Sequence, residues 1–252
     1  MRNMGTSPVA IWRGLRLSEH ILTGMVLTVL LNREETQRRA GRQFPTVIQW
    51  WHRRLCKILG IELEITGDMT DGQALLVANH VSWIDIPIIG AVTNTTFLSK
   101  SEVRKWPLIG WLAGSAGTLF ISRGNGATSE LAVKMSQTIS GKERPVLVFP
   151  EGTTTDGTEV KRFFPRLFSV ATDAGIPVQP IAIRYTCEGH LDTRAAYIDD
   201  DSFPVHLAQT LKRKPSHKVQ ITFCEPIQPD GQSRKELAEI TRERIVEALE
   251  AA

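Results

Sequence analysis

From Gly60 onward, short apolar runs alternate with stretches that repeat their apolar residues at helical spacing. The apolar runs are rich in Val, Ile and Leu, which is typical of strands buried on both faces of a parallel sheet. They predict strands over residues 61–66, 74–78, 96–99, 117–121, 146–149, 178–183 and 219–223. The stretches between them predict helices over residues 84–92, 128–140, 164–173, 202–211 and 233–249. This alternation predicts an α/β fold with a single, mainly parallel sheet flanked by helices.

The most apolar run of the chain lies before this region, at residues 21–31. It is shorter than the roughly 20 apolar residues that cross a bilayer, and its extension toward the N-terminus meets charged residues, among them Arg13 and Arg16. No small-residue cleavage site follows it, which argues against a secretory signal. We therefore expect a short apolar helix that does not span a membrane.

Residues 44–59 form a second helical segment, this one amphipathic. Trp50 and Trp51 stand beside a row of basic residues, and this combination is typical of the interface between a membrane and water. The pattern predicts an N-terminal two-helix anchor over residues 1–59 on an anionic membrane surface, followed by an α/β domain over residues 60–252. The alternative is a helical hairpin that packs on the body of the protein.

The distribution of charge also favours an N-terminal membrane contact. Residues 1–60 hold 10 Lys or Arg against 3 Asp or Glu, although the formal charge of the whole chain is only +3. So small a net charge gives no reason to expect a nucleic-acid partner. Cys56, Cys187 and Cys224 are scattered, without a Cys-x-x-Cys pair or a nearby histidine cluster. This scatter excludes a disulfide scaffold and a zinc ribbon, and we expect no metal site.

Candidate chemistry begins at residues 74–87, where a predicted strand leads to Asn79 and His80. Histidine is the side chain best suited to remove a hydroxyl proton near neutral pH, and Asp85, about one helical turn further on, can hold its other ring nitrogen. The pair would form a general base with its orienting carboxylate and needs no serine. Two alternatives stay open: His80 is an ordinary histidine at a strand end, or Asp85 completes a capping box with Ser82.

Three further segments carry polar or unusual residues at predicted strands. The strand at residues 146–149 ends in Pro-Glu-Gly, three threonines and Asp-Gly, where open α/β sheets present their ligand crevice; the alternative is a polar turn. The strand at residues 117–121 is followed by Arg123, an anion ligand in such a crevice but merely solvated on a surface loop. The strand at residues 178–183 contains Pro180, which predicts an edge strand or a special turn.

Together and in this order, these segments resemble the four conserved blocks of the glycerolipid acyltransferase family, the 1-acyl-sn-glycerol-3-phosphate acyltransferases and their relatives. The blocks are Asn-His-x4-Asp, Phe-Ile-x-Arg, Phe-Pro-Glu-Gly-Thr and an apolar strand with a central proline. The resemblance covers roughly residues 70–185, and the two N-terminal helices also look like the membrane-surface anchor of the family. The matching residues are Asn79, His80 and Asp85, then Phe120, Ile121 and Arg123, then Phe149 to Thr153, and finally Pro180.

This resemblance implies a reaction and a place of action. His80 would act as general base on the free hydroxyl of a lysophospholipid, with Asp85 orienting it and acyl-CoA or acyl-carrier protein as the acyl donor. No bound cofactor and no covalent acyl-enzyme are expected. The commonest acceptor of the family is lysophosphatidate, so we expect 1-acyl-sn-glycerol-3-phosphate to become phosphatidic acid at the cytoplasmic face of a bacterial inner membrane. The implied substrate-binding residues are Lys100, Arg123, Glu151, Gly152 and Thr153.

One departure from the family pattern concerns the acceptor. Many members carry Arg directly after Phe-Pro-Glu-Gly-Thr, and that Arg is taken to bind the phosphate of the acceptor, whereas this sequence has Thr154. Either other cations supply the missing charge, or the acceptor is a lysolipid without a bare phosphate, such as lyso-ornithine lipid. The candidate cations are Lys100, Arg123, Lys161 and Arg162.

Other classes of protein lack their signatures in this sequence. It has no Gly-x-Ser-x-Gly of a serine hydrolase, no phosphate loop, no His-Glu-x-x-His and no Gly-x-Gly-x-x-Gly after a strand. A peripheral lipid-binding protein without turnover is the alternative from a different class. The presence of both His80 and Asp85 argues against it.

Overall fold

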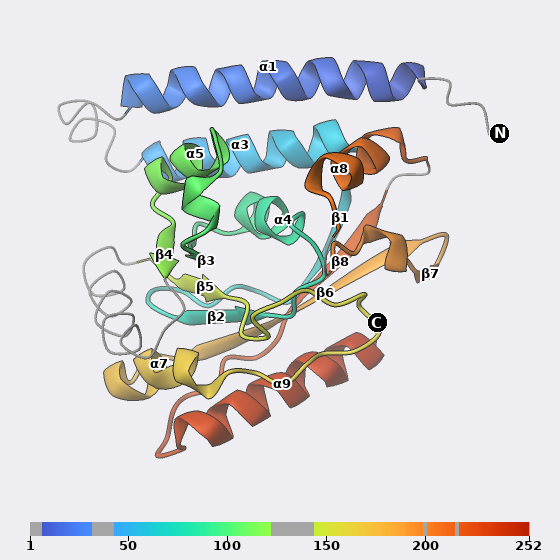
Figure 1. Ribbon diagram of the computed structural model, residues 1–252. Helices are drawn as coiled ribbons and strands as arrows, with labels where there is room; N and C mark the ends of the chain where they lie inside the picture. Colours follow the sequence, from blue (N-terminus) through green and yellow to red (C-terminus); the bar gives the residue numbers. More distant parts are fainter. Residues whose placement is uncertain (1–6, 32–42, 122–143, 199–200, 215–216, 252) are drawn as a thin grey trace.

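The computed structural model describes residues 7–31, 43–121, 144–198, 201–214 and 217–251, and these fold around one sheet (Figure 1). Within these residues the sheet has eight strands in the order β1-β8-β6-β2-β5-β3-β4, with β7 paired to β6. The strands are β1 (Glu62–Thr66), β2 (Leu75–Ala78), β3 (Thr96–Lys100), β4 (Leu119–Ile121), β5 (Val146–Val148), β6 (Val178–Cys187), β7 (His190–Leu191) and β8 (Lys218–Phe223).

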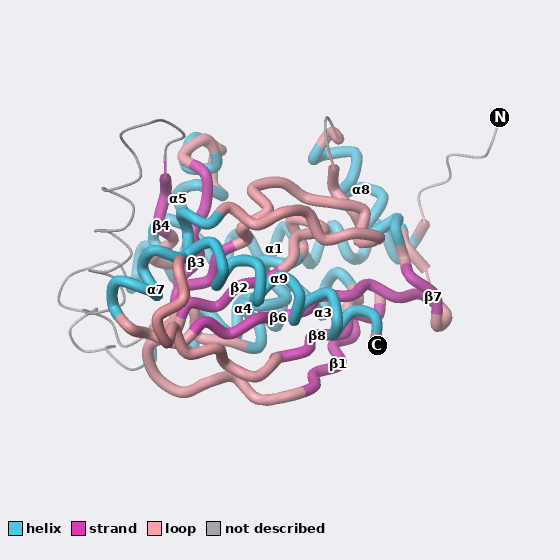
Figure 2. Tube along the Cα trace, turned by 90° about the horizontal axis from the view of Figure 1, so that it is seen from below, coloured by secondary structure: helices cyan, strands magenta, loops and turns pink. Residues whose placement is uncertain are grey.

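The helices lie on both sides of this sheet. They are α1 (Pro8–Leu31), α3 (Gln43–Leu59), α4 (Asp85–Val92), α5 (Ile109–Ser115), α7 (Ser169–Ala174), α8 (Phe203–Lys212) and α9 (Arg234–Glu250), with short 3-10 turns η1 (Val103–Lys105), η2 (Pro165–Phe168) and η3 (Thr193–Ala195). Figure 1 shows α3 and α4 above the sheet and α7 and α9 below it. Figure 2, from below, shows α9 lying in front of the strands.

The direction of the strands decides where a site can form. Strands β2, β5, β3 and β4 are successive parallel neighbours, and β6 runs parallel to β2 on its other side. Only the pairs of β6 with β8 and with β7 are antiparallel among the described ladders. The predicted mainly parallel sheet is therefore confirmed. The carboxyl ends of five strands meet at one edge, where open α/β sheets bind their ligands.

Alternating side chains of β2 fill two separate cores. Leu75 and Val77 join the cluster beneath the sheet that contains Phe168, while Leu76 joins the cluster above the sheet that contains Ile88. Burial on both faces explains why the strands appear in the sequence as nearly continuous apolar runs. The same periodicity explains why the sequence predicts this strand and its neighbours so closely.

Helix α1 differs from the helix expected at residues 21–31, because it begins at Pro8. By length and composition alone it is long and apolar enough to cross a membrane. Two polar residues that interrupt the sequence pattern, Arg13 and His20, turn toward the body of the protein and are buried. Arg13 donates to the carbonyl oxygens of Leu211 and Arg213 at the end of α8, at 3.4 and 3.0 Å, which ties the two helices together.

Pro180 lies in β6, a central strand, so the edge strand predicted from this proline is wrong. Val178 exchanges hydrogen bonds with Ile227. The backbone of Pro180, two residues further along β6, is directed toward the same neighbouring segment. Its carbonyl accepts the N–H of Cys224 at 3.0 Å, at a point where the neighbouring chain leaves strand geometry between Phe223 and Ile227. The N–H that proline lacks is therefore not needed for a ladder hydrogen bond there.

The helix predicted over residues 128–140 lies outside the described residues, so it stays a prediction. Two differences concern other helices. The helix predicted over residues 164–173 is divided into η2 and α7, and α5 was not predicted. Helix α9 starts as its sequence predicts, because Ser233 and Glu236 form a reciprocal capping box.

Candidate active site

His80 stands two residues after β2, and Asp85 is the first residue of α4, so both belong to one tight turn at the carboxyl edge of the sheet. The Nδ1 atom of His80 lies 2.7 Å from Oδ2 of Asp85. The Asp85 side chain is fully buried, whereas 19% of the His80 side chain is exposed. The pair is therefore anchored at the carboxylate and open to solvent at the ring.

The hydrogen bonds around Asp85 decide which ring nitrogen of His80 is protonated. Oδ2 of Asp85 also accepts the backbone N–H groups of Val81 at 2.8 Å and Ser82 at 2.9 Å. Because this oxygen acts as an acceptor toward all its partners, Nδ1 of His80 donates to it. In the neutral ring the lone pair then lies on Nε2, which has no hydrogen-bond partner among the described residues. This tautomer is the one a general base requires.

The bond from Ser82 shows that the capping alternative and the catalytic interpretation are compatible. The carboxylate of Asp85 accepts the Ser82 N–H, as the acidic residue of a capping box does. The hydroxyl of Ser82, however, is buried without a hydrogen-bond partner in the described part of the chain, so the reciprocal half of the box is missing. Asp85 thus stabilises the turn and holds His80 at the same time.

Tyr185, near the end of β6, is the site residue that the sequence does not reveal. Its hydroxyl donates to Oδ1 of Asp85 at 2.6 Å, and its side chain is among the largest that are fully buried. Burial, with the Asp85 charge adding to it, raises the pKa of Tyr185 well above its usual value, so the phenol remains a donor. The only signal in the sequence is a tyrosine in a buried strand, which needs a partner for its hydroxyl.

The Phe-Pro-Glu-Gly-Thr segment holds the main chain of His80. Glu151 accepts the N–H of His80 on Oε1 and the N–H of Lys161 on Oε2, both at 2.8 Å, and the N–H of Thr155 donates to the carbonyl of His80 at 2.9 Å. Burial raises the pKa of Glu151, and the two N–H donors oppose that shift. Glu151 is therefore bonded to backbone on both oxygens.

Two residues on either side of Glu151, Phe149 and Gly152, lie close to rings. The ring of Phe149 stacks on that of His80, with centroids 4.0 Å apart and planes 16° from parallel. Gly152 has φ +68°, and a Cβ atom there would lie 2.7 Å from the ring of Phe164. Both facts require glycine at this position. Thr153, the next residue, is exposed at the surface of the turn.

Thr154, at the position where many family members carry Arg, is bonded to the main chain. Its hydroxyl donates to the backbone carbonyl of Tyr197, and the N–H of Tyr197 donates to the carbonyl of Val81 at 3.0 Å. This hydroxyl links two loops of the site.

The predicted cations are placed unequally. Lys100 ends β3 at the same edge of the sheet as His80, with β5 between their two strands, and it is exposed. Lys161 and Arg162 are exposed on the loop after Thr155. Arg123 lies outside the described residues. Within the residues that the structure describes, no group of three His, Cys, Asp or Glu residues could hold a metal ion.

Asn79, the first residue of the motif, has a structural role that its sequence position does not reveal. Its side-chain nitrogen donates to the carbonyl of Ile183 at 3.0 Å, and its side-chain oxygen accepts the N–H of Ile183 at 2.8 Å. The amide thus extends the ladder between β2 and β6 one step beyond Ala78. This extension brings β6, and with it Tyr185, against the turn that carries Asp85.

Comparisons with known proteins point to one family. Residues 61–184 match the family model described as Acyltransferase. The chain is 44% identical over 201 residues to a lyso-ornithine lipid O-acyltransferase of Pseudomonas aeruginosa, covering 80% of this chain and 77% of the relative. It is 32% identical to the enzyme of the same name from Rhodobacter capsulatus, covering 90% of this chain and 84% of that one.

Two further relatives carry the other acceptor in their names. A 1-acyl-sn-glycerol-3-phosphate acyltransferase of Neisseria gonorrhoeae is 34% identical over 56% of each chain. The crystal structure of the 1-acyl-sn-glycerophosphate (LPA) acyltransferase PlsC from Thermotoga maritima has the same fold, with a TM-score of 0.68 and 23% identity over 96% of this chain and 94% of that one. From its sequence relatives, this chain belongs to the acyltransferase family and is an acyltransferase of the lysophospholipid type.

Proposed function

We propose that His80 is the general base of acyl transfer from a thioester to the hydroxyl of a lysolipid. The acceptor hydroxyl gives its proton to Nε2 of His80 while its oxygen attacks the thioester carbonyl. An ester bond then forms, the carbon–sulfur bond breaks, and the departing thiolate takes the proton back from His80. The observation that supports this role is the pairing of Nδ1 with Asp85, which leaves Nε2 as the open acceptor.

The remaining residues of the site position this base. Asp85 orients the ring and stabilises the positive charge that develops on it during proton transfer. Glu151 and Thr155 act through the main chain of His80, so we assign Glu151 a positioning role. The predicted substrate contacts are then left to Gly152 and Thr153, directly after Glu151 in the chain, and to Lys100 and Arg123.

The acyl donor is a thioester of coenzyme A or of acyl-carrier protein, because a thiolate is a good leaving group that a histidine base can release without a covalent acyl-enzyme. The reaction then needs no bound cofactor.

The acceptor we place first is lyso-ornithine lipid. The relatives that carry this name match most of the chain, and the hydroxyl of Thr154 is bonded to the Tyr197 carbonyl rather than open to an anion. The second candidate is 1-acyl-sn-glycerol-3-phosphate, which the sequence alone favours and which the Neisseria relative carries in its name. A phosphate would then be bound by cations such as Lys100.

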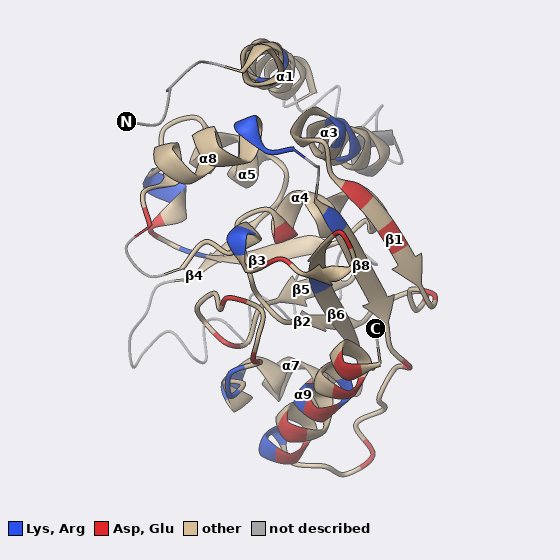
Figure 3. Ribbon diagram, turned by 90° about the vertical axis from the view of Figure 1, so that its right-hand side faces the viewer, with Lys and Arg blue, Asp and Glu red and all other residues tan. Residues whose placement is uncertain are grey.

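The place of action that we propose is the cytoplasmic face of a bacterial inner membrane. The outward face of α1 exposes an apolar row that includes Leu15, Leu22 and Val26, and the first 60 residues are rich in Lys and Arg. Figure 3 shows charged residues along α9, on the side of the sheet away from α1. The molecule thus has an apolar side for the bilayer and a charged side for water.

Substituting Leu15 and Leu22 by aspartate should abolish co-sedimentation with anionic vesicles.

The deciding experiment compares thiol release from acyl-CoA by the purified protein with lyso-ornithine lipid, lysophosphatidate or no acceptor. Release that depends on an acceptor supports the transferase, release without one indicates a thioesterase, and no release indicates a binding protein.

His80→Ala should lose about 10²–10⁴-fold in kcat, the usual contribution of a general base. The matched control is His190→Ala, on exposed β7. Near wild-type turnover of His80→Ala would refute the base.

A further inference from the structure

The turn η1 and the start of α5 leave four large apolar side chains partly exposed in the described part of the chain. Trp106, Leu108, Ile109 and Trp111 are each between 38% and 46% exposed. Side chains of this size are seldom left open in such close succession without a partner. We call residues 103–111 the aromatic hairpin.

The backbone of this hairpin holds Leu108 at its tip. Leu108 has φ 62° and ψ −54°, and the N–H of Ile109 donates to the carbonyl of Pro107 at 2.7 Å. This is a γ-turn of the rare, strained kind with positive φ. A leucine gains no conformational freedom there and leaves 46% of its surface exposed, so the fold alone gives little reason for a large apolar side chain at the tip.

The charges around the hairpin are those of a membrane interface. Arg104 and Lys105 are exposed directly before Trp106, with Glu102 as the neighbouring carboxylate. The guanidinium of Arg104 lies 5.7 Å from the centre of the Phe120 ring, which holds it beside the apolar residues. Tryptophan at the level of the headgroups, with cations facing anionic lipid phosphates, is the usual composition of such a contact.

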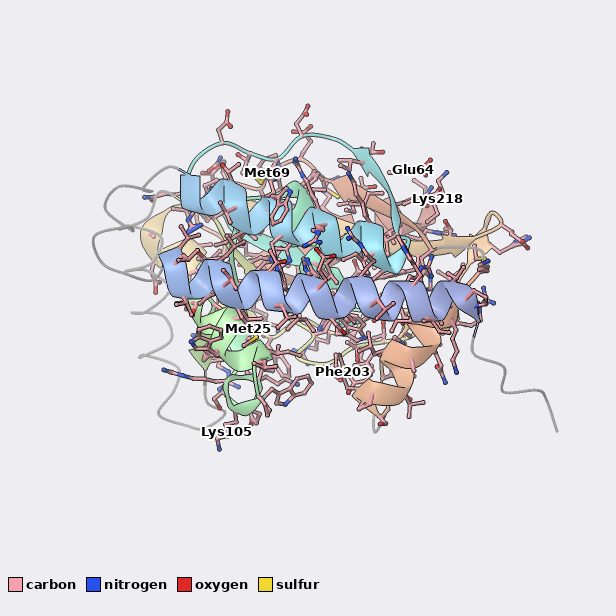
Figure 4. All side chains as sticks on the ribbon, turned by 90° about the horizontal axis from the view of Figure 1, so that it is seen from above. Met25, Glu64, Met69, Lys105, Phe203 and Lys218 are labelled. Atoms are coloured by element: carbon pink, nitrogen blue, oxygen red, sulfur yellow. The ribbon has the colours of Figure 1, made fainter. Side chains whose placement is uncertain are left out.

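The hairpin lies beside α1. Helix α1 packs against both α5 and α8, and seen from above it has these two helices along one flank, where Lys105 and Phe203 are labelled (Figure 4). The exposed apolar row of α1 is Ile11, Trp12, Leu15, Leu22, Val26, Val29 and Leu30. A group of partly exposed apolar and aromatic side chains beside a long apolar helix fits a fluid bilayer.

Aromatic contacts lead from the hairpin to the catalytic turn. The rings of Trp106 and Phe203 have centroids 5.5 Å apart, and those of Phe203 and Trp83 are 5.3 Å apart. Trp83 belongs to the same turn as His80 and Asp85. A bilayer that contacts the hairpin therefore lies next to the site where a lipid acceptor must react.

We propose that the aromatic hairpin is a second membrane contact, separate in sequence from the N-terminal helices, which inserts Leu108 and Trp111 into the headgroup region of an anionic bilayer. This inference rests on the proposed function, because it assumes that the acceptor is delivered from that bilayer. Its role is to fix the tilt of the molecule, so that the edge of the sheet carrying His80 faces the membrane.

The direct test places an environment-sensitive fluorophore on a cysteine at the tip, in the full-length Leu108→Cys protein. Vesicles rich in phosphatidylglycerol should shift its emission to the blue, and brominated lipids should quench it. The matched control is Ile65→Cys on β1, which is also about half exposed, and the unsubstituted protein labelled in parallel corrects for its own cysteines. No shift at position 108 while the protein co-sediments with the vesicles would overturn the proposal. A blue shift that grows with protein concentration in the absence of vesicles would also overturn the proposal, because such a shift indicates contact between copies of the chain.

A kinetic test separates this contact from the proposed function. Leu108→Gly relieves the positive φ, so the double variant Leu108→Gly, Trp111→Ser should fold. We expect its KM for an acceptor embedded in anionic vesicles to rise about tenfold, with turnover of the same acceptor dispersed in detergent unchanged. The Ile65→Ser protein should match the wild type in both assays. An unchanged KM on vesicles would refute the hairpin contact, whereas a wild type without acceptor-dependent turnover would refute the proposed function.

Discussion

At the scale of single residues, the contact between Tyr185 and Asp85 is the feature of the site that one substitution tests most directly. Its hydroxyl is the described donor to Oδ1 of Asp85, while Oδ2 is shared by His80 and two backbone N–H groups. Tyr185→Phe keeps the ring and removes this hydrogen bond, so the carboxylate loses one of the contacts that fix its plane. Hydrogen bonds to charged groups contribute about 1.5–3 kcal/mol, and we expect kcat to fall about tenfold or more.

The measurement is steady-state kinetics with both substrates varied, together with the melting temperature. A positioning role predicts a loss in kcat with little change in the KM for the acyl donor. The chain offers a matched control in its other tyrosine, since Tyr197 contributes main-chain hydrogen bonds to the site and Tyr197→Phe leaves them intact. Equal kcat for Tyr185→Phe and the wild type would contradict the role.

Glu151→Gln tests whether the carboxylate holds the loop. Each carboxylate oxygen accepts one backbone N–H, from His80 or from Lys161, and an amide would turn its NH2 group toward one of these donors. The lost bond and the unsatisfied buried donor should lower the free energy of unfolding by about 1–3 kcal/mol and reduce kcat. Urea unfolding measures the first effect. The exposed Glu159→Gln is the control and should change neither quantity.

Sequence could predict the part of the site that is local. His80 and Asp85 lie in one turn, so their spacing alone brings the imidazole and the carboxylate together. The contact of Tyr185 with Asp85 spans 100 residues and exists only because β6 lies beside β2. The two N–H partners of Glu151 likewise depend on how two loops meet, which no spacing along the chain encodes.

At the scale of elements, sequence succeeded where the chemistry of burial repeats regularly. The strands of the sheet centre are apolar on both faces, so β2 and β5 begin and end within a residue of their predicted limits. The helix α5 is too short for a helical period to emerge from a segment rich in Trp, Gly and Pro. The prediction from Pro180 failed because the neighbouring chain leaves strand geometry near Cys224, and only the tertiary structure shows this.

The packing of α1 on α3 should depend on pH. His20 of α1 stacks on Trp51 of α3, with ring centroids 4.3 Å apart, and neither ring nitrogen of His20 has a hydrogen-bond partner among the described residues. Burial lowers the pKa of His20 to about 4; the nearby Arg54 adds to this shift and Glu19 opposes it. Burial likewise lowers the pKa of His52, on α3, to about 4. Histidine in an unfolded chain titrates near 6.5, so the unfolded state binds more protons between these two values.

It follows that the free energy of unfolding falls as the pH decreases from about 6.5 toward 4. His20→Phe keeps an aromatic ring against Trp51 and cannot be protonated, so it should make this pH dependence shallower. Urea unfolding at pH 7 and pH 5 provides the comparison, with His190→Ala on exposed β7 as the control that should retain the wild-type slope. If the pH dependence of the free energy of unfolding is the same in His20→Phe and the wild type, the burial of His20 does not control the stability of this interface.

At the scale of the whole molecule, the N-terminal helices and the catalytic body share one core. Leu55, Cys56 and Leu59 of α3 lie in the same buried cluster as Leu76 of the central sheet. The division of the chain at residue 59 remains a prediction. In this arrangement α1 presents the outer apolar row, while α3 joins it to the helix α4 that begins at Asp85. Helix α1 and the turn that carries His80 and Asp85 are thus connected through one helix.

The identity of the acceptor is the property of the whole molecule that a single substitution can test. Thr154 stands where many family members carry Arg, and its hydroxyl is bonded to the Tyr197 carbonyl. Thr154→Arg would add a cation beside the catalytic turn. A charged hydrogen bond contributes about 1.5–3 kcal/mol against about 0.5–1.5 for a neutral one, so kcat/KM for lysophosphatidate should rise about fivefold or more relative to lyso-ornithine lipid.

Two controls separate this effect from others. Thr154→Val removes the hydroxyl without adding charge, so it should lower both activities and leave their ratio unchanged. Thr158→Arg adds the same charge at an exposed position on the loop and tests for a general electrostatic effect on anionic lipids. If Thr154→Arg leaves the ratio of the two activities at its wild-type value, position 154 does not contact the acceptor headgroup. If Thr158→Arg changes the ratio as much as Thr154→Arg does, the preference reflects the overall charge of the loop, and the headgroup must be recognised by residues elsewhere.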